Sequence, residues 1–78
     1  MPKFYFHLYD DVVTQDEEGA ELLNVQAAHD RAVLGARDMA CAEVHSGNLF
    51  LQHRIEVADE RGDLVATVRF ADVVTVER

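Results

Sequence analysis

Cys41 and His45 are the two residues whose types and spacing suggest chemistry most directly. Four positions apart on a helix, a thiol and an imidazole share one face, as metal ligands and nucleophile–base pairs do. A tetrahedral metal site needs two further ligands, and only a second copy of the chain could bring such a set together. The helix dipole also disfavours a thiolate in the C-terminal half of a helix. We therefore predict no catalytic residue, no metal and no cofactor.

The segment from Asp10 to Glu21 contains six carboxylates and could in principle bind a cation. A calcium loop of the EF-hand type needs ligands at alternate positions, glycine at the sixth and glutamate at the twelfth. Neither Asp10 nor Asp16 begins such a series. The segment is therefore expected to be a solvated acidic loop.

The net charge of the whole chain argues against two classes of partner. Fifteen acidic and seven basic residues give a formal charge of -8, and the basic residues are scattered along the sequence. Such a balance repels nucleic-acid phosphates and anionic membrane surfaces. The 49% hydrophobic content is too high for a disordered acidic tail. We expect a folded domain that binds neither nucleic acid nor membrane.

The segment Lys3–Tyr9 alternates hydrophobic and polar positions and predicts a strand with two different faces. Tyr5, His7 and Tyr9 lie on one of these faces. Arg69, in a later strand, is expected on the same face of the sheet. These side chains form the first candidate surface for a protein partner or a small ligand.

A single helix is predicted over residues 24–47, after the N-cap Asn24 and up to Gly47. Its core stripe is mostly alanine, so the helix can lie flat and close on a sheet. Leu34 and Cys41 fall on the opposite side, seven residues apart, where they have no evident role in folding. That side is the second candidate interaction surface.

Short strands are predicted before and after this helix. Asp59–Asp63 predicts a hairpin loop in which Gly62 supplies a positive φ angle. The fold class is therefore α+β, a single domain over residues 1–78. We expect an antiparallel sheet of four to five strands in ββαββ order, with one helix on one face. The expected strands are Lys3–Tyr9, Val12–Thr14, Arg54–Ala58, Leu64–Phe70 and an edge strand over residues 73–77.

Nearly the whole chain resembles an uncharacterised family of short bacterial proteins, domain of unknown function 6894. Its members have an aromatic opening that ends in histidine, a D-x-x-G-x-E segment, a helix beginning D-L-x-A-A and a closing V-x-D-x-x-G hairpin. The matching positions are Phe4, Tyr5, Phe6 and His7, then Asp16, Gly19 and Glu21, then Asn24, Ala27 and Ala28, and finally Val57, Asp59 and Gly62. The sequence departs at Asp11, where glycine is usual, and at Asn24, where aspartate is common. The resemblance implies no activity and assigns no catalytic residue.

Length and cysteine content indicate where such a protein works. A domain of 78 residues buries only about 60% of its unfolded surface, which favours stabilisation by oligomerisation. A lone cysteine, Cys41, excludes an internal disulfide and fits a reducing compartment. No apolar run approaches the roughly 18 residues of a membrane span, and the first residues become acidic too early for a signal peptide. We expect a cytoplasmic location.

Two functional hypotheses follow. The first is a small interaction or regulatory module without catalysis, which associates with itself as a homodimer or other homo-oligomer, or with another protein. The second is a small-ligand-binding protein or minor enzyme that uses Tyr5, His7, Tyr9 and Arg69. The second hypothesis requires a concave site among those side chains.

Overall fold

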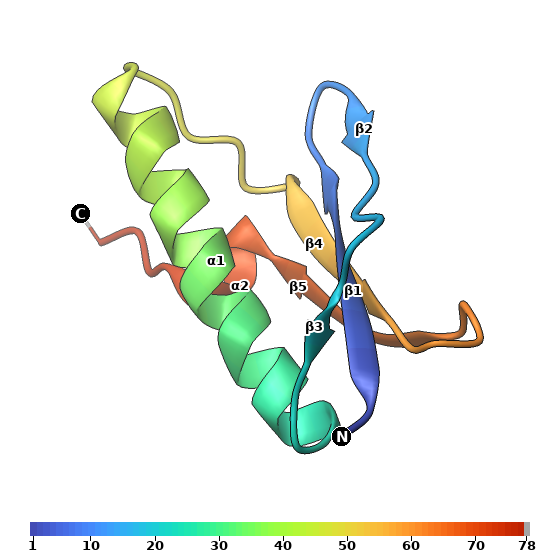
Figure 1. Ribbon diagram of the computed structural model, residues 1–78. Coiled ribbons are helices and arrows are strands. Elements are labelled where there is room, and N and C mark those ends of the chain that lie inside the picture. Colours follow the sequence, from blue (N-terminus) through green and yellow to red (C-terminus); the bar gives the residue numbers. More distant parts are fainter. Residues whose placement is uncertain (78) are drawn as a thin grey trace.

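The computed structural model describes residues 1–77 and consists of two layers, an antiparallel sheet and a helical layer on one of its faces (Figure 1). In chain order the elements are β1 (Lys3–Tyr9), β2 (Val13–Thr14), β3 (Ala20–Glu21), α1 (Val25–His45), β4 (Arg54–Ala58), β5 (Leu64–Arg69) and α2 (Phe70–Val73). The predicted α+β class is confirmed, as is the one main helix on one face of the sheet.

α1 begins and ends where the sequence predicts. The Oδ1 atom of Asn24 accepts a hydrogen bond from the Ala27 N–H at 2.9 Å, which satisfies an unpaired donor of the first turn. Ser46 follows the last turn, and Gly47 has a φ angle of 98°, the left-handed conformation that ends many helices. The buried side of α1 is a stripe of alanines: Ala28, Ala32, Ala36 and Ala40.

The sheet has the order β2-β1-β4-β5, and β3 pairs with β1 near its N-terminal end. All of these pairs are antiparallel. Gly62 has a φ angle of 86° in the hairpin between β4 and β5, as predicted. The Asp59 carboxylate holds this hairpin by accepting hydrogen bonds from the Arg61 and Asp63 N–H groups, both at 2.9 Å.

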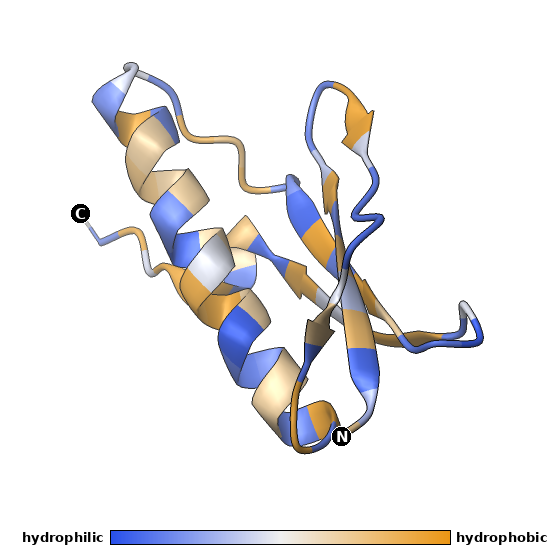
Figure 2. Ribbon diagram, viewed as in Figure 1, coloured by the Kyte–Doolittle hydropathy of each residue, from blue (hydrophilic) through white to orange (hydrophobic). Residues whose placement is uncertain are grey.

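The side chains of the strands alternate between a hydrophobic face toward α1 and a more polar face away from it, and Figure 2 shows the change of hydropathy along each strand. The face toward α1 forms the core with the alanine stripe. Its fully or almost fully buried members from the strands and α2 are Phe4, Ile55, Val57, Val68 and Phe70. The alternation of the predicted strands Lys3–Tyr9, Arg54–Ala58 and Leu64–Phe70 places all five on one face of the sheet.

The C-terminal segment is the part of the fold that the sequence predicts wrongly. Instead of an edge strand over residues 73–77, Phe70–Val73 form the short helix α2, and residues 74–77 form no strand. Phe70 is 1% exposed, and the Asp72 carboxylate accepts a hydrogen bond from the Arg69 N–H at 3.0 Å. This anchor and this cap outweigh the β-branched composition of the segment. The fifth strand is β3 instead.

The position of α1 on the sheet leaves part of β1 uncovered. α1 packs mainly on β4, β5 and α2. Phe6 and Leu8 of β1 point to the helix side of the sheet, yet both are only half-buried. The space beside them lies between α1 and the segment that carries β2 and β3.

Candidate interaction surfaces

The face of the sheet that points away from α1 brings together four of the residues singled out from the sequence. His7 pairs with Glu56, and Tyr9 pairs with Arg54. On the next strand, Arg69 lies opposite Arg54 and Thr67 lies opposite Glu56. We call this surface the open sheet face; it consists of Tyr5, His7, Tyr9, Arg54, Glu56, Thr67 and Arg69.

Several side chains of the open sheet face are held in place by their neighbours. The Arg54 guanidinium lies 4.3 Å from the centre of the Tyr9 ring, and its Nε donates a hydrogen bond to Glu56 at 2.8 Å. The rings of Tyr5 and His7 are nearly parallel, with centres 6.5 Å apart. Because these side chains are already fixed, they would lose less conformational entropy when a partner binds.

The charge of the open sheet face differs from that of the rest of the protein. β1, β4 and β5 contribute to this side three of the seven basic residues, Lys3, Arg54 and Arg69, and one carboxylate, Glu56. Glu56 is paired with Arg54, whereas Arg69 makes no ion pair within residues 1–77. A chain with a charge of -8 therefore has a locally basic, tyrosine-rich face.

Leu34 and Cys41 are exposed, as the helical pattern predicts, and Leu34 is 62% exposed. They lie on the side of α1 away from the sheet, so the structure does not bring them together with the open sheet face. His45 is exposed at the end of the same helix. Within residues 1–77, no three His, Cys, Asp or Glu side chains gather in a way that could hold a metal ion.

The acidic segment between β1 and α1 is organised by one of its carboxylates, Asp16. Its Oδ2 accepts a hydrogen bond from the Phe6 N–H at 3.1 Å, and its Oδ1 accepts from Glu18 and Gly19. Partial burial acts to raise the pKa of Asp16, but these three N–H donors and nearby His7 outweigh it and lower the pKa below its ordinary value.

Asp16 also connects the acidic segment to the open sheet face. Its backbone N–H donates to Nδ1 of His7 at 3.0 Å, which places the proton of the neutral ring on Nε2. Gly19 has a φ angle of 70°, and a Cβ there would lie 3.0 Å from the Phe4 carbonyl oxygen. The two ends of the D-x-x-G motif therefore have different roles. Asp16 joins the acidic segment to the edge of β1, and Gly19 lets the segment pass close to β1.

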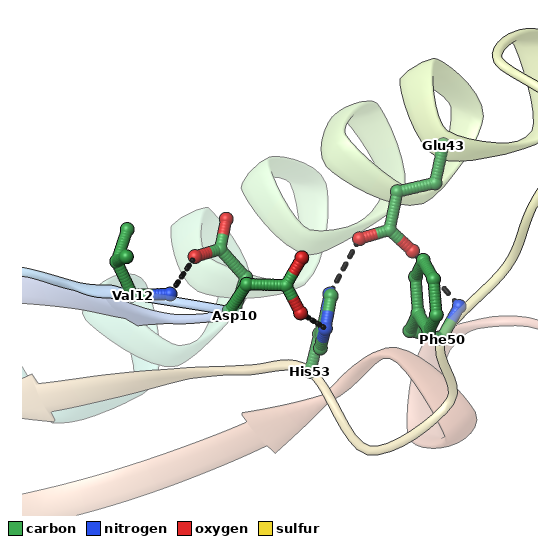
Figure 3. A network of polar contacts seen from close by, with 6 residues as sticks. Asp10, Val12, Glu43, Phe50 and His53 are labelled. Carbon is green, nitrogen blue, oxygen red and sulfur yellow. Dashed lines mark hydrogen bonds and ion pairs between the residues drawn. The ribbon is translucent and has the colours of Figure 1, made fainter.

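His53, which sequence analysis did not single out, lies at the centre of a polar cluster between the β1–β2 turn and the end of α1 (Figure 3). Its Nδ1 donates a hydrogen bond to Oε2 of Glu43 at 2.6 Å, and its Nε2 lies 3.7 Å from Oδ1 of Asp11. The ring stacks on Phe50, with centres 4.7 Å apart, and meets the edge of Phe70.

This cluster fixes the connector between α1 and β4. The other oxygen of Glu43 accepts a hydrogen bond from the Phe50 N–H at 2.9 Å. The His53 carbonyl accepts from the Phe70 N–H at 2.8 Å, which joins the connector to α2. No short sequence motif signals this arrangement, because Glu43 and His53 are ten residues apart with a helix end and a loop between them.

The largest hollows described for residues 1–77 involve Phe6, Leu8 and Met39, on the opposite side of the sheet from the open sheet face. Three of them, with volumes of about 500, 320 and 230 Å³, lie between α1 and the segments around β1. Tyr5, His7, Tyr9 and Arg69 line none of these three. The concave site that the ligand-binding hypothesis requires is therefore not formed by these hollows.

The fold and its surfaces define a small α+β domain with a helix on one face of an antiparallel sheet and mostly half-buried side chains on the other. The chain belongs to the family described as a domain of unknown function (DUF6894), whose model matches residues 3–71. No curated protein and no solved structure matches the chain.

The family match spans the elements that position both surfaces, from β1 to the first residues of α2. It confirms the family predicted from the motifs of the sequence. Neither α1 nor α2, the helices within the described residues, is long and apolar enough to cross a membrane.

Proposed function

We propose that this protein is a small interaction module without catalysis, which self-associates through the open sheet face. The observation that carries the proposal is that both tyrosines, Arg54 and Arg69 lie on one face of the sheet that neither α1 nor α2 covers. The strands contribute only one carboxylate, Glu56, to that face. The cores of protein–protein interfaces are enriched in tyrosine and arginine and depleted of acidic residues. A second copy is a suitable partner, because Arg69 of each copy can meet Glu56 of the other across a two-fold axis.

Three further properties support this proposal. Small domains gain stability by burying an additional surface in an oligomer. The side chains of Arg54 and His7 already have polar partners that fix their orientation. The face is three strands wide, at the low end for specific complexes, so we expect a dissociation constant of roughly 10–100 μM.

The proposal includes a cytoplasmic location and excludes nucleic acid and membranes as partners. A single exposed cysteine, Cys41, fits a reducing compartment. The charge of -8 opposes binding to phosphate-rich surfaces, and the three basic residues of the sheet do not offset it. The absence of catalysis is supported by the position of Cys41 in the C-terminal half of α1, where the helix dipole disfavours a thiolate.

Light scattering during size-exclusion chromatography tests the proposal over a range from about 5 to 500 μM. The mass of the wild-type protein should rise toward that of a dimer across this range. Tyr9→Glu should remain a monomer, because it removes the Tyr9 ring and its packing with Arg54 from the contact. Leu34→Glu is the matched control, since it adds the same charge on the outer side of α1.

A wild-type protein that stays monomeric over the whole range contradicts self-association. A dimer that Leu34→Glu abolishes and Tyr9→Glu leaves intact assigns the contact to α1 instead. Circular dichroism of both variants confirms that the fold is retained before the masses are compared.

A further inference from the structure

Neighbouring hollows form a groove along one side of α1. Three hollows on the helix side of the sheet share Leu8 and Met39 in their linings, so they lie next to one another. One wall is α1, and the other is formed by β1 and the segment between β2 and β3. We call this feature the helix–strand groove, and its central floor consists of Phe6, Leu8 and Met39.

The groove exists because the helix wall is built from small residues. Gly35 and Ala42 face the space beside β1, on either side of Met39. Gly35 has no side chain and that of Ala42 is a single methyl group, so neither covers Phe6 or Leu8, which remain half-buried. Hydrophobic side chains that the fold leaves partly open in a concave surface mark a binding site more often than scattered exposed ones do.

Gly35 is a further sign that this space is kept open. Glycine inside a helix is less stable than alanine by about 1 kcal/mol. A Cβ at position 35 would meet only Cδ1 of Ile55, at 3.4 Å, which is at the edge of ordinary van der Waals contact. Packing of α1 on the sheet therefore does not require glycine here. What the missing side chain provides is room in the groove.

The charges at the rim indicate what the groove can bind. Glu17 and Glu18 line its wide end, and Asp10 and Glu43 line the opposite end. One cation, Arg31, lies within its lining, with its guanidinium 5.8 Å from the centre of the Phe6 ring. A ligand with negative charges would be repelled along most of this rim, and one with positive charges would be attracted.

We propose that the helix–strand groove binds a basic, hydrophobic peptide segment of a partner protein. Leucine-like side chains of the segment contact Phe6, Leu8 and Met39, and its lysine or arginine side chains reach the acidic rim. The helix wall from Arg31 to Ala42 is about 17 Å long, which matches about five residues of an extended peptide. This site lies on the opposite side of the sheet from the proposed self-association surface and does not depend on it.

The binding test uses a heptapeptide of alternating lysine and leucine and a matched heptapeptide of alternating glutamate and leucine. Two-dimensional NMR of the ¹⁵N-labelled protein follows both titrations to about 1 mM peptide. The lysine peptide should shift the amide signals of Gly35, Met39 and Glu18, and the glutamate peptide should not.

Two pairs of variants test the location and the charge. Met39→Ala should weaken binding of the lysine peptide about fivefold, whereas Leu34→Ala, an exposed position on the other side of α1, should leave it unchanged. Glu18→Gln should weaken it about threefold, whereas Glu21→Gln, which does not line the groove, should have no effect. Gly35→Leu should abolish binding by filling the space, with the fold checked by circular dichroism.

Several results would overturn the proposal. One is equal binding of the two peptides, because it would remove the role of the rim charges. Another is a set of signal shifts confined to the open sheet face or to the outer side of α1. Absence of shifts at 1 mM lysine peptide, or an effect of Leu34→Ala equal to that of Met39→Ala, would also contradict it.

Discussion

The two faces of β1 show how one short strand can build two different surfaces. Tyr5, His7 and Tyr9 point to the open sheet face, where Arg54 and Arg69 surround them and one carboxylate is present. Phe6 and Leu8 point to the helix side, where they form the floor of a groove with an acidic rim. The alternation of the strand separates a flat basic face from a hollow acidic one.

This difference has a simple physical origin. The open sheet face is uncovered because the described chain places both of its helices on the same side of the sheet (Figure 1). The groove is open because α1 packs mainly on β4, β5 and α2 and leaves β1 partly free. We therefore propose different partners for the two surfaces: the open sheet face suits a second sheet face, and the groove beside α1 suits a narrow peptide segment.

The largest expected effect comes from Asp16, because it connects the two surfaces. Asp16→Asn should lower the free energy of unfolding by about 2 kcal/mol, since the amide can accept with one oxygen while three N–H groups need partners. Urea unfolding at neutral pH measures this loss. Glu17→Gln, an exposed neighbour without these bonds, is the control and should change the stability little.

The same residue predicts a pH dependence with a definite sign. Because the folded-state pKa of Asp16 lies below its ordinary value, the stabilisation is present at neutral pH. This stabilisation should be lost as the pH falls, first through the ordinary pKa of an aspartate and then through the lower pKa of Asp16 in the folded protein. Urea unfolding between about pH 5 and pH 2 should show a smaller decline in Asp16→Asn than in the wild type. Identical declines would contradict the role assigned to this carboxylate.

His53→Ala should have the next largest effect, and it should lower the stability of the fold without changing the open sheet face. Loss of the bond to Glu43 and of the contacts with Phe50 and Phe70 should cost about 1.5 kcal/mol. Thermal and urea unfolding measure this cost, with His45→Ala as the exposed control. Self-association should persist in His53→Ala, because the cluster lies away from the open sheet face. A loss of dimer equal to that of Tyr9→Glu would show that the two surfaces are coupled.

Gly35→Ala should change fold stability and peptide binding in opposite directions. The free energy of unfolding should rise by about 0.5–1 kcal/mol, because alanine is the better helix former. Binding of the lysine peptide should weaken about threefold, because the new methyl group occupies the groove. Urea unfolding and NMR titration measure the two effects. Tighter peptide binding together with higher stability would show that glycine is not keeping room for a ligand.

Ionic strength should produce the smallest effects, again with opposite signs. Salt screens the repulsion between two chains of charge -8, so self-association should strengthen by about twofold between low and physiological salt. Salt also screens the attraction of a basic peptide to the acidic rim, so peptide binding should weaken by a similar factor. Light scattering measures self-association and NMR measures peptide binding, each at two salt concentrations. If salt changed both affinities in the same direction, the assigned charges would be contradicted.

Much of the fold could be predicted from the sequence, because its signals are local. Asn24 and Gly47 determine the ends of α1 through their own caps. Alternation predicts β1, β4 and β5, and Gly62 predicts the hairpin between the last two. The members of the open sheet face follow from the same alternation once the strands are paired.

The remaining features depend on contacts between distant residues. α2 forms because Phe70 is anchored in the core, which the β-branched residues around it do not indicate. His53 and Glu43 meet only after the connector folds back on α1. The groove depends on where α1 lies across the sheet, and a helical pattern predicts the buried side of a helix but not its lateral position.

The most direct test of two separate surfaces is one NMR experiment with two titrations of the same labelled protein. Dilution should shift the amide signals of Thr67 and Arg69 on β5 and leave Gly35 unchanged. Addition of the lysine peptide should shift Gly35 and Met39 and leave Thr67 unchanged. If both titrations move the same set of signals, the protein has one binding surface and the division described for β1 has no functional meaning.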